Sequence, residues 1–219
     1  MIETDLAAKV IAHLRGQGWE IYQEVEYRGR RADIVATLGR FIRIVECKTR
    51  YSVALVQQAY DWRGWAHFVD VAYPYTHSRG HEVLDLFCAE HGIGRIEVGR
   101  YSDGAVQDGS GPRLDRKAIV RFLRGRLCEE HKTFCAAGSP AGGYYSPWQQ
   151  TCRLVREDVA REPGVELRVL LDRINHHYVS AASARCAMAK WIRAGSVTGV
   201  RLETEGRKLR LYPREAVEK

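Results

Sequence analysis

Two apolar segments separated by only two residues constrain the fold most strongly. The segments 32–38 and 41–48 are rich in isoleucine and valine, and Gly39-Arg40 lies between them. Glycine at the first of two loop residues is typical of a type II′ turn, which joins adjacent antiparallel strands. The sequence therefore predicts a β-hairpin whose strands are too apolar for either face to lie in water.

This hairpin would bring two acidic side chains together. If Leu38 faces Phe41, then Asp33 lies opposite Glu46, and like charges in such cross-strand pairs are destabilising. Buried carboxylates need a compensating cation, and Mg²⁺ prefers carboxylate and water oxygens. Lys48 follows Glu46 by two residues, so the strand period places it on the same face. Two acids and a lysine at one point can bind a metal, activate a water and neutralise a reacting phosphate. The alternative is a solvent-facing hairpin with a Glu46–Lys48 ion pair.

The rest of the chain predicts further helices and strands around this hairpin. The spacing of Leu6, Val10 and Leu14 predicts a first helix that stops near Gly16 and Gly18, and further helices are expected at 53–67 and 81–91. Strands are expected at 19–26, 68–73 and 95–98, which gives an αβββαβ order followed by one more helix and strand. Loops are expected at 101–112 and 136–147, and a helix at 116–130. This pattern predicts an α/β fold with a mixed sheet.

The spacing of Asp33 and the Glu46-Cys47-Lys48 triplet, within an αβββαβ order, resembles the PD-(D/E)xK nuclease superfamily. The likeness covers about residues 1–98 and is greatest to the Holliday-junction-resolvase and restriction-endonuclease-like branch. Ala32 stands where that motif has its proline. The resemblance implies that Asp33 and Glu46 bind metal and that Lys48 positions or activates the attacking water.

Two further residues match positions that the resemblance makes functional. Glu3 lies on the apolar stripe of the first helix, where related resolvases carry a metal-binding glutamate; it could instead be a first-turn acid that complements the helix dipole. Gln58 falls on the inward stripe of the second helix, with Gln57 turned away, and Gln58-Ala59-Tyr60 resembles a motif of many members. The alternative for Gln58 is a core glutamine bonded to backbone.

Positive charge indicates a polyanionic partner. The chain carries a net charge of +7, and residues 153–219 hold 14 basic and 9 acidic residues, a net of +5. Because arginine matches phosphate bidentately, we expect arginines near the proposed site to bind DNA; these are Arg28, Arg30, Arg31, Arg43 and Arg50.

The C-terminal third ends in helices and a basic hairpin, which together resemble a winged helix. Its expected DNA-binding residues are Arg185, Lys190, Arg193, Arg207, Lys208 and Arg210. A winged helix can also bind protein, so both roles stay open. The expected organisation is a nuclease-like domain at 1–125, a linker at 126–150 and a winged-helix-like domain at 151–219.

The six cysteines show no disulfide-scaffold spacing, and Glu3 and Asp5 lie where a secretory leader would be basic. We therefore expect a cytoplasmic protein, with no segment apolar enough to span a membrane. Cys128, His131 and Cys135, with Cys152 beyond, have the ligand types of a zinc site but match no familiar spacing, so a structural Zn²⁺ is the minor alternative to packing.

These observations predict an Mg²⁺-dependent DNA endonuclease, with Mn²⁺ as a substitute metal. The alternatives are a DNA-binding protein that keeps the nuclease fold without activity, and a relative that cleaves RNA. A homodimer is possible, because one site per chain cuts one strand.

Overall fold

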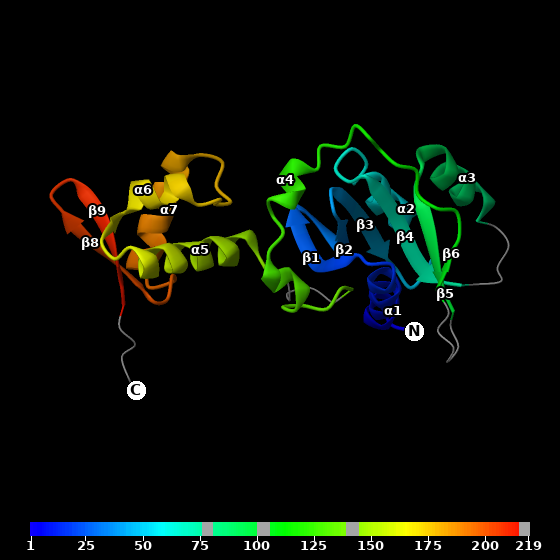
Figure 1. The fold of residues 1–219 in the computed structure, drawn as a ribbon, viewed down its shortest axis with the longest axis horizontal. Coiled ribbons are helices and arrows are strands. Elements are labelled where there is room, and N and C mark those ends of the chain that lie inside the picture. Colours follow the sequence, from blue (N-terminus) through cyan, green and yellow to red (C-terminus); the bar gives the residue numbers. More distant parts are fainter. Residues whose placement is uncertain (76–80, 100–105, 139–144, 215–219) are drawn as a thin grey trace. The chain divides into compact units, whose positions relative to one another are not determined.

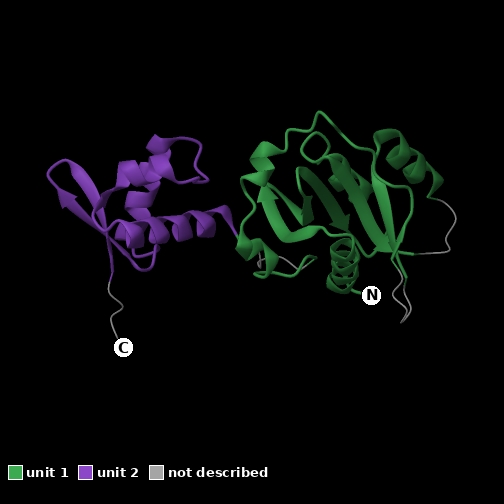
Figure 2. Ribbon diagram, viewed as in Figure 1, with its two compact units in different colours: residues 1–145 green, residues 146–219 purple. Residues whose placement is uncertain are grey.

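The computed structural model describes residues 1–75, 81–99, 106–138 and 145–214. The chain forms two compact units, Met1–Tyr145 (unit 1) and Ser146–Lys219 (unit 2), which Figure 2 shows in separate colours. Each unit has hydrophobic core clusters of its own.

Unit 1 contains a mixed six-stranded sheet with helices on both faces (Figure 1). Its elements are α1 (Glu3–Gly16), β1 (Glu20–Tyr27), β2 (Arg30–Leu38), β3 (Phe41–Cys47), α2 (Val53–Tyr60), β4 (Phe68–Pro74), α3 (Glu82–His91), β5 (Gly94–Val98), β6 (Val106–Asp108), α4 (Arg121–Arg124) and the 3₁₀ helix η1 (Glu129–Lys132). The predicted α/β class and mixed sheet are confirmed.

The strands lie in the sheet in chain order, β1 to β6. Neighbours are antiparallel from β1 to β3, parallel from β3 to β5, and antiparallel again between β5 and β6. Because α2 connects β3 to β4 and α3 connects β4 to β5, the parallel strands are joined through helices, as such strands require.

Two apolar layers hold the helices on the sheet. Leu6, Val10 and Leu14 of α1 are fully buried against one face, together with Ile34 and Val45 of the central strands. The opposite face packs against α2, α3 and α4. Alternation along β3 divides its side chains between the layers, with Ile42 and Ile44 on the α2 side.

The hairpin at the centre of the sheet has the predicted register. Its pairs run from Leu38–Phe41 to Ile34–Val45, so the next position places Asp33 opposite Glu46. Gly39 has a φ of +54°, as the first residue of a type II′ turn requires. A second tight turn at Arg28-Gly29, with φ of +56° and +73°, joins β1 to β2.

Two predicted helices differ from the structure. The helix expected at 53–67 ends at Tyr60, and Gly64 in the following turns has a φ of +79°, which a continuing helix cannot accommodate. The helix expected at 116–130 is wrong: only Arg121–Arg124 and the 3₁₀ turn at Glu129–Lys132 are helical. The reason is that α4 buries a single large side chain, Leu123, which is too little to hold a long helix.

The segment expected as a linker also differs. Residues 126–138 belong to unit 1, where Gln23 on the edge strand β1 bonds the backbone of Lys132 and Ala137 at 3.0 Å each. Within the loop expected at 101–112, Val106–Asp108 forms the edge strand β6. Residues 100–105 and 139–144 lie outside the described part of the chain.

Unit 2 is a small helical unit with a three-stranded sheet in the order β7-β9-β8. Its elements are α5 (Pro147–Arg161), β7 (Val165–Glu166), α6 (Leu167–Arg173), α7 (Ala181–Arg193), β8 (Val200–Glu205) and β9 (Lys208–Pro213). The helices expected in the C-terminal third are present as α5, α6 and α7, and β8 and β9 form the expected C-terminal hairpin around Gly206.

Candidate active site

Asp33 lies buried near the start of β2. One of its carboxylate oxygens, Oδ2, accepts a hydrogen bond of 2.8 Å from the backbone N–H of Cys47 on β3. Burial raises the pKa of Asp33, and this outweighs the hydrogen bond and the Lys48 charge, which act in the opposite direction. Asp33 is thus held against the neighbouring strand in an environment that disfavours its negative charge.

Glu46, on β3, is only 2% exposed and lies on the α2 side of the sheet. Trp62, which follows α2, donates a hydrogen bond of 2.5 Å from Nε1 to Glu46 Oε1. Burial first, and the Asp33 charge second, raise the pKa of Glu46 well above its ordinary value. The two carboxyl groups are within hydrogen-bonding reach, so a proton on Glu46 can be donated to Asp33. The pair predicted from the hairpin register is therefore assembled.

Lys48 lies directly after β3 and extends toward the start of α1. Its Nζ donates a hydrogen bond of 2.6 Å to Glu3 Oε1. Burial alone would lower the pKa of Lys48, but the Glu3 hydrogen bond and the charges of Asp33, Glu3 and Glu46 together raise it. Lys48 therefore keeps its positive charge beside the carboxylate pair, and Glu3 is tied to the same site through it.

Glu46 lines a small open pocket of about 170 Å³, although the residue itself is almost fully buried. Gln58 and Trp62 line it from the α2 side, and Arg30 and Arg31 line it from β2. The prediction that Gln58 is buried on the inward stripe of its helix is wrong, because the residue is exposed. It nevertheless shares this pocket with Glu46, while Gln57 bonds Asp61.

The arginines expected near the site separate into two groups. Arg30 donates a hydrogen bond of 2.9 Å to the Asp61 carbonyl oxygen. Arg28 lies over the Trp65 ring, with its Cζ 4.7 Å from the ring centroid, and Arg50 is exposed. Arg31 pairs with the carboxylate of Glu24 on β1. These four lie on the turn and strand next to the carboxylate pair or just beyond Lys48.

Arg43 does not belong to this group. It points into the opposite layer and forms a bidentate ion pair with the fully buried Asp70, with both N···O distances at 2.8 Å. The prediction that Arg43 clusters near the site is wrong, because residues of odd number in β3 face α1. Arg43 neutralises a core carboxylate instead.

Glu24 is a residue at the site that sequence reasoning missed. It is 1% exposed, has a φ of +53° within β1, and stands at the register position opposite Asp33. Its carboxylate contacts Arg31 Nε at 2.7 Å and accepts a hydrogen bond of 2.8 Å from the Gly138 N–H. The signal available in the sequence was an acidic residue between the apolar Tyr22 and Val25 of an expected strand.

Gly138 connects Glu24 to the start of α1. It has a φ of +75°, and a Cβ at this position would lie 3.0 Å from atoms of Glu3. The positive φ favours glycine, and any Cβ here would require Glu3 to shift by a few tenths of an ångström. The segment before residue 139 is thereby packed on two acidic residues of the site.

The expected metal ligands are Glu3, Asp33 and Glu46. Among the described residues, no group of three or more His, Cys, Asp or Glu side chains is arranged to hold a metal ion. Glu3 is bonded to Lys48, so the oxygen donors that stand together are Asp33 and Glu46. Two carboxylates beside an open pocket suit Mg²⁺, which retains water ligands and binds substrate phosphates.

The zinc alternative has no complete ligand set in the described residues. Cys128 Sγ lies 3.1 Å from His131 Nδ1, whereas Cys135 Sγ donates to the Ala136 carbonyl. Burial lowers the pKa of His131, whose ring packs against Tyr145. These contacts give His131 a packing role in unit 1.

The basic residues expected in unit 2 are placed mostly at its surface. Arg185, Lys190 and Arg193 lie exposed on α7, and Lys190 Nζ is 5.3 Å from the Trp191 ring centroid. In the hairpin, Arg207 is exposed, while Lys208 pairs with Glu166 at 3.3 Å and Arg210 with Glu205 at 2.7 Å. Neutralisation by these acids leaves α7 as the more positive element.

Comparison with known proteins identifies no relative: no family model, no curated protein and no solved structure matches the chain. Within the described residues, no helix combines the length and apolar character needed to cross a bilayer.

Proposed function

We propose that the chain is a metal-dependent DNA endonuclease that hydrolyses phosphodiester bonds at the Asp33–Glu46 pair. The observation that carries this proposal is the forced proximity of two buried carboxyl groups with raised pKa values, next to a charged lysine and an open pocket. Such an arrangement destabilises the protein by itself, and perturbed carboxyl groups of this kind are concentrated at functional sites.

The fold supports the proposal through its connectivity. The αβββαβ order, with β1 to β4 adjacent and β3 parallel to β4, resembles the core of the PD-(D/E)xK nucleases. In that comparison Asp33, Glu46 and Lys48 take the motif positions, Gln58 the helix position and Glu3 the position on the first helix.

Each residue has a role that follows from its contacts. Asp33 and Glu46 would hold a divalent ion, and when bound this ion would lower the pKa of a water molecule and offset phosphate charge. The N–H groups of Cys47 and Trp62 fix the two carboxylates. Lys48 is charged and can donate to a phosphate oxygen as negative charge develops there.

The pocket wall supplies phosphate contacts. Arg30 and Arg31 line it beside Glu46, and their guanidinium groups can bind phosphates that flank the cleaved bond. During hydrolysis the water oxygen forms a bond to phosphorus, the bond from phosphorus to one sugar oxygen breaks, and that oxygen takes up a proton.

We propose for unit 2 a winged-helix-like role in DNA binding. Its support is the exposed basic face of α7 together with the C-terminal hairpin. Binding of a partner protein is the alternative for this unit, and a homodimer would supply the second site needed to cut both strands.

A nicking assay on supercoiled plasmid tests the activity. Purified protein with Mg²⁺ or Mn²⁺ should convert the plasmid to nicked circles, and Asp33→Asn or Glu46→Gln should abolish conversion. Glu82→Gln is the matched control, because it removes an exposed carboxylate on α3 of the same unit. Cleavage of linear and branched DNA, with RNA added as a competitor, then defines the substrate.

Three results would count against the proposal. Unchanged nicking by Asp33→Asn would exclude the assigned site. Plasmid binding without metal-dependent nicking would favour the non-catalytic DNA-binding alternative. Faster cleavage of RNA than of DNA would favour the RNA-cleaving alternative.

A further inference from the structure

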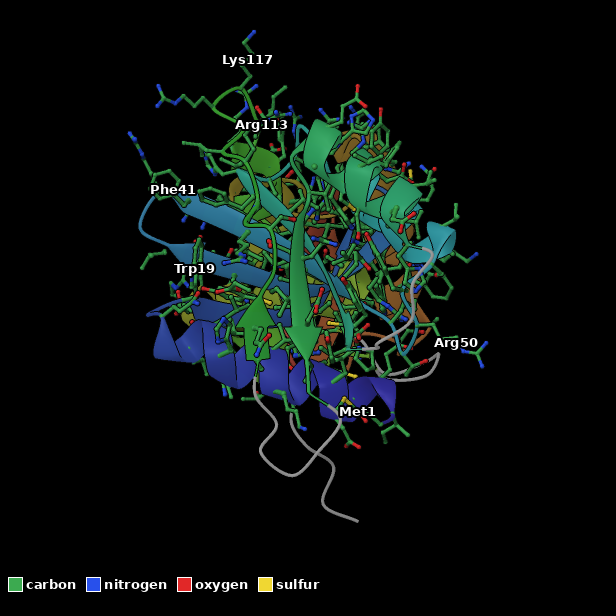
Figure 3. All side chains as sticks on the ribbon, turned by 90° about the vertical axis from the view of Figure 1, so that its right-hand side faces the viewer. Met1, Trp19, Phe41, Arg50, Arg113 and Lys117 are labelled. Atoms are coloured by element: carbon green, nitrogen blue, oxygen red, sulfur yellow. The ribbon has the colours of Figure 1, made fainter. Side chains whose placement is uncertain are left out.

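Two adjoining open hollows lie at the opposite end of the central strands from the carboxylate pair. They have volumes of about 200 and 420 Å³, and both are lined by His67 and Leu114. Phe41, at the start of β3, lines the larger one, so the hollows are ~17 Å from Glu46 along the strand, at ~3.3 Å per residue. In Figure 3, Phe41, Arg113 and Lys117 lie on one side of the molecule, whereas Arg50 and Met1 lie on the other.

The polar side chains of these hollows are almost all hydrogen-bond donors. Four arginines line them: Arg40, Arg63, Arg113 and Arg116. Arginine has no acceptor atom and keeps its charge at any physiological pH. The one acidic side chain is Asp115, whose Oδ1 accepts a hydrogen bond of 2.9 Å from the Lys117 backbone N–H.

The two histidines also present donors. The Nδ1 atom of His67 accepts a hydrogen bond of 3.1 Å from the Ile42 N–H, and the Nδ1 atom of His91 accepts one of 3.1 Å from Arg63. In a neutral imidazole the remaining nitrogen must then carry the proton. Both rings therefore have an Nε2–H group, for which no acceptor is observed among the described residues.

The local field is strongly positive. Burial lowers the pKa of His67, and the charges of Arg124 and Arg40 lower it further, against a smaller opposite effect of Asp115. A bound anion would offset this field. A ligand rich in acceptor oxygens and negative charge fits such surroundings, and a phosphate group has both properties.

The walls of the smaller hollow are fixed by backbone hydrogen bonds. The Arg113 N–H donates a hydrogen bond of 3.0 Å to the Gly92 carbonyl oxygen, and the Asp115 N–H donates one of 2.8 Å to the His67 carbonyl oxygen. A Cβ at Gly92 would come within 2.7 Å of Arg113 Cβ, so glycine lets the arginine cross close to the end of α3. The backbone of this wall is thus in place before any ligand binds, and it carries the exposed guanidinium groups.

We infer that these hollows form a phosphate-binding site, separate from the carboxylate pair, in which guanidinium and imidazole donors hold the phosphates of a nucleic acid backbone or of a free polyphosphate. The inference rests on the donor set and the walls, and it does not depend on nuclease activity. Arg40 and Arg116 are exposed and, among the described residues, form no ion pair, so they are free to bind the ligand.

Binding of a short duplex oligonucleotide in EDTA tests the site without cleavage. Arg40→Ala/Arg116→Ala should weaken duplex binding by roughly tenfold, since hydrogen bonds to charged groups are lost. The slope of log affinity against log salt should fall by about 0.9 for each phosphate contact removed. Both residues are exposed, so the variant should fold. The control, Arg168→Ala, removes an exposed arginine from α6 of unit 2.

A second measurement distinguishes the two sources of phosphate. Pyrophosphate is added to the wild type, to Arg40→Ala/Arg116→Ala and to the control Arg168→Ala while the imidazole NMR signals of His67 and His91 are followed. Shifts in the wild type that the variant loses would support a site for a free polyphosphate. Weakened duplex binding without pyrophosphate shifts would support the nucleic acid backbone. If neither measurement separates the variant from Arg168→Ala, the inference is overturned.

Discussion

Replacing Glu46 by glutamine should change protein stability in opposite directions without and with a divalent metal. Without metal, Glu46→Gln removes a negative charge that burial and Asp33 disfavour. The new amide can still accept from Trp62 Nε1 and can donate to Asp33, so the hydrogen bonds at the site are kept. With metal, ion binding stabilises the folded wild type, whereas the glutamine variant binds the ion weakly and gains little of this stabilisation.

The stabilisation by metal is the larger of the two effects. Relief of a like-charge cross-strand pair is worth up to ~1 kcal/mol, and burial places this pair at the upper end of that range. Metal at about 100 times its dissociation constant stabilises the folded protein by about 2.7 kcal/mol. For a chain of this length each kcal/mol raises the Tm by ~2–4 °C, so metal should raise the wild-type Tm by about 5–11 °C.

Thermal unfolding of the wild type, Glu46→Gln and Glu82→Gln, followed by circular dichroism with EDTA or Mn²⁺ at mildly alkaline pH, measures both effects. The variant should unfold at a higher temperature than the wild type in EDTA and at a lower one in Mn²⁺, while Glu82→Gln follows the wild type. The reasoning would be refuted if Glu46→Gln were less stable than the wild type in EDTA, or if Mn²⁺ raised its Tm as much as it raises that of the wild type.

Three further predictions concern pH, the core and the two units. Because the pKa values of Asp33 and Glu46 are raised in the folded state, their contribution to metal-free stability should be largest at acidic pH and fall as pH rises through those raised values. Urea unfolding of the wild type and Glu46→Gln in EDTA over a pH series checks this, and a stability difference that does not change with pH contradicts it. Arg43→Met should lower the unfolding free energy by ~3–5 kcal/mol because it leaves Asp70 buried and unpaired, and Arg43→Met/Asp70→Leu should recover most of the loss in urea unfolding. Residues 1–145 alone should still nick plasmid at low salt but bind duplex with a flatter salt slope than the full chain; an unchanged slope would make unit 2 a protein-interaction module.

The parts of the fold that the sequence predicted well are those with strong local signals. The hairpin around Gly39 combined a turn residue with two apolar strands, and its register alone brought Asp33 opposite Glu46. The helix at 116–130 failed because its apolar residues, such as Ile119 and Phe122, are exposed, and only tertiary packing reveals that.

The parts of the site that the sequence did not predict depend on contacts between distant segments. Trp62 reaches Glu46 only because α2 ends early, and the contact of Gly138 with Glu24 joins residues more than a hundred positions apart. The positive φ of Glu24 also interrupts the alternation of side chains between the two faces of β1. A prediction from the two-residue period of a strand cannot foresee this.

The packing of Gly138 has a consequence for how this sequence can evolve. A side chain at that position would be strained by the positive φ and would press on Glu3, so a mutation there would disturb the acidic site. In a library randomised at position 138 and selected for function, glycine should therefore be retained almost alone. A loop residue far from the hairpin in sequence would be under the same selection as the carboxylates that it supports.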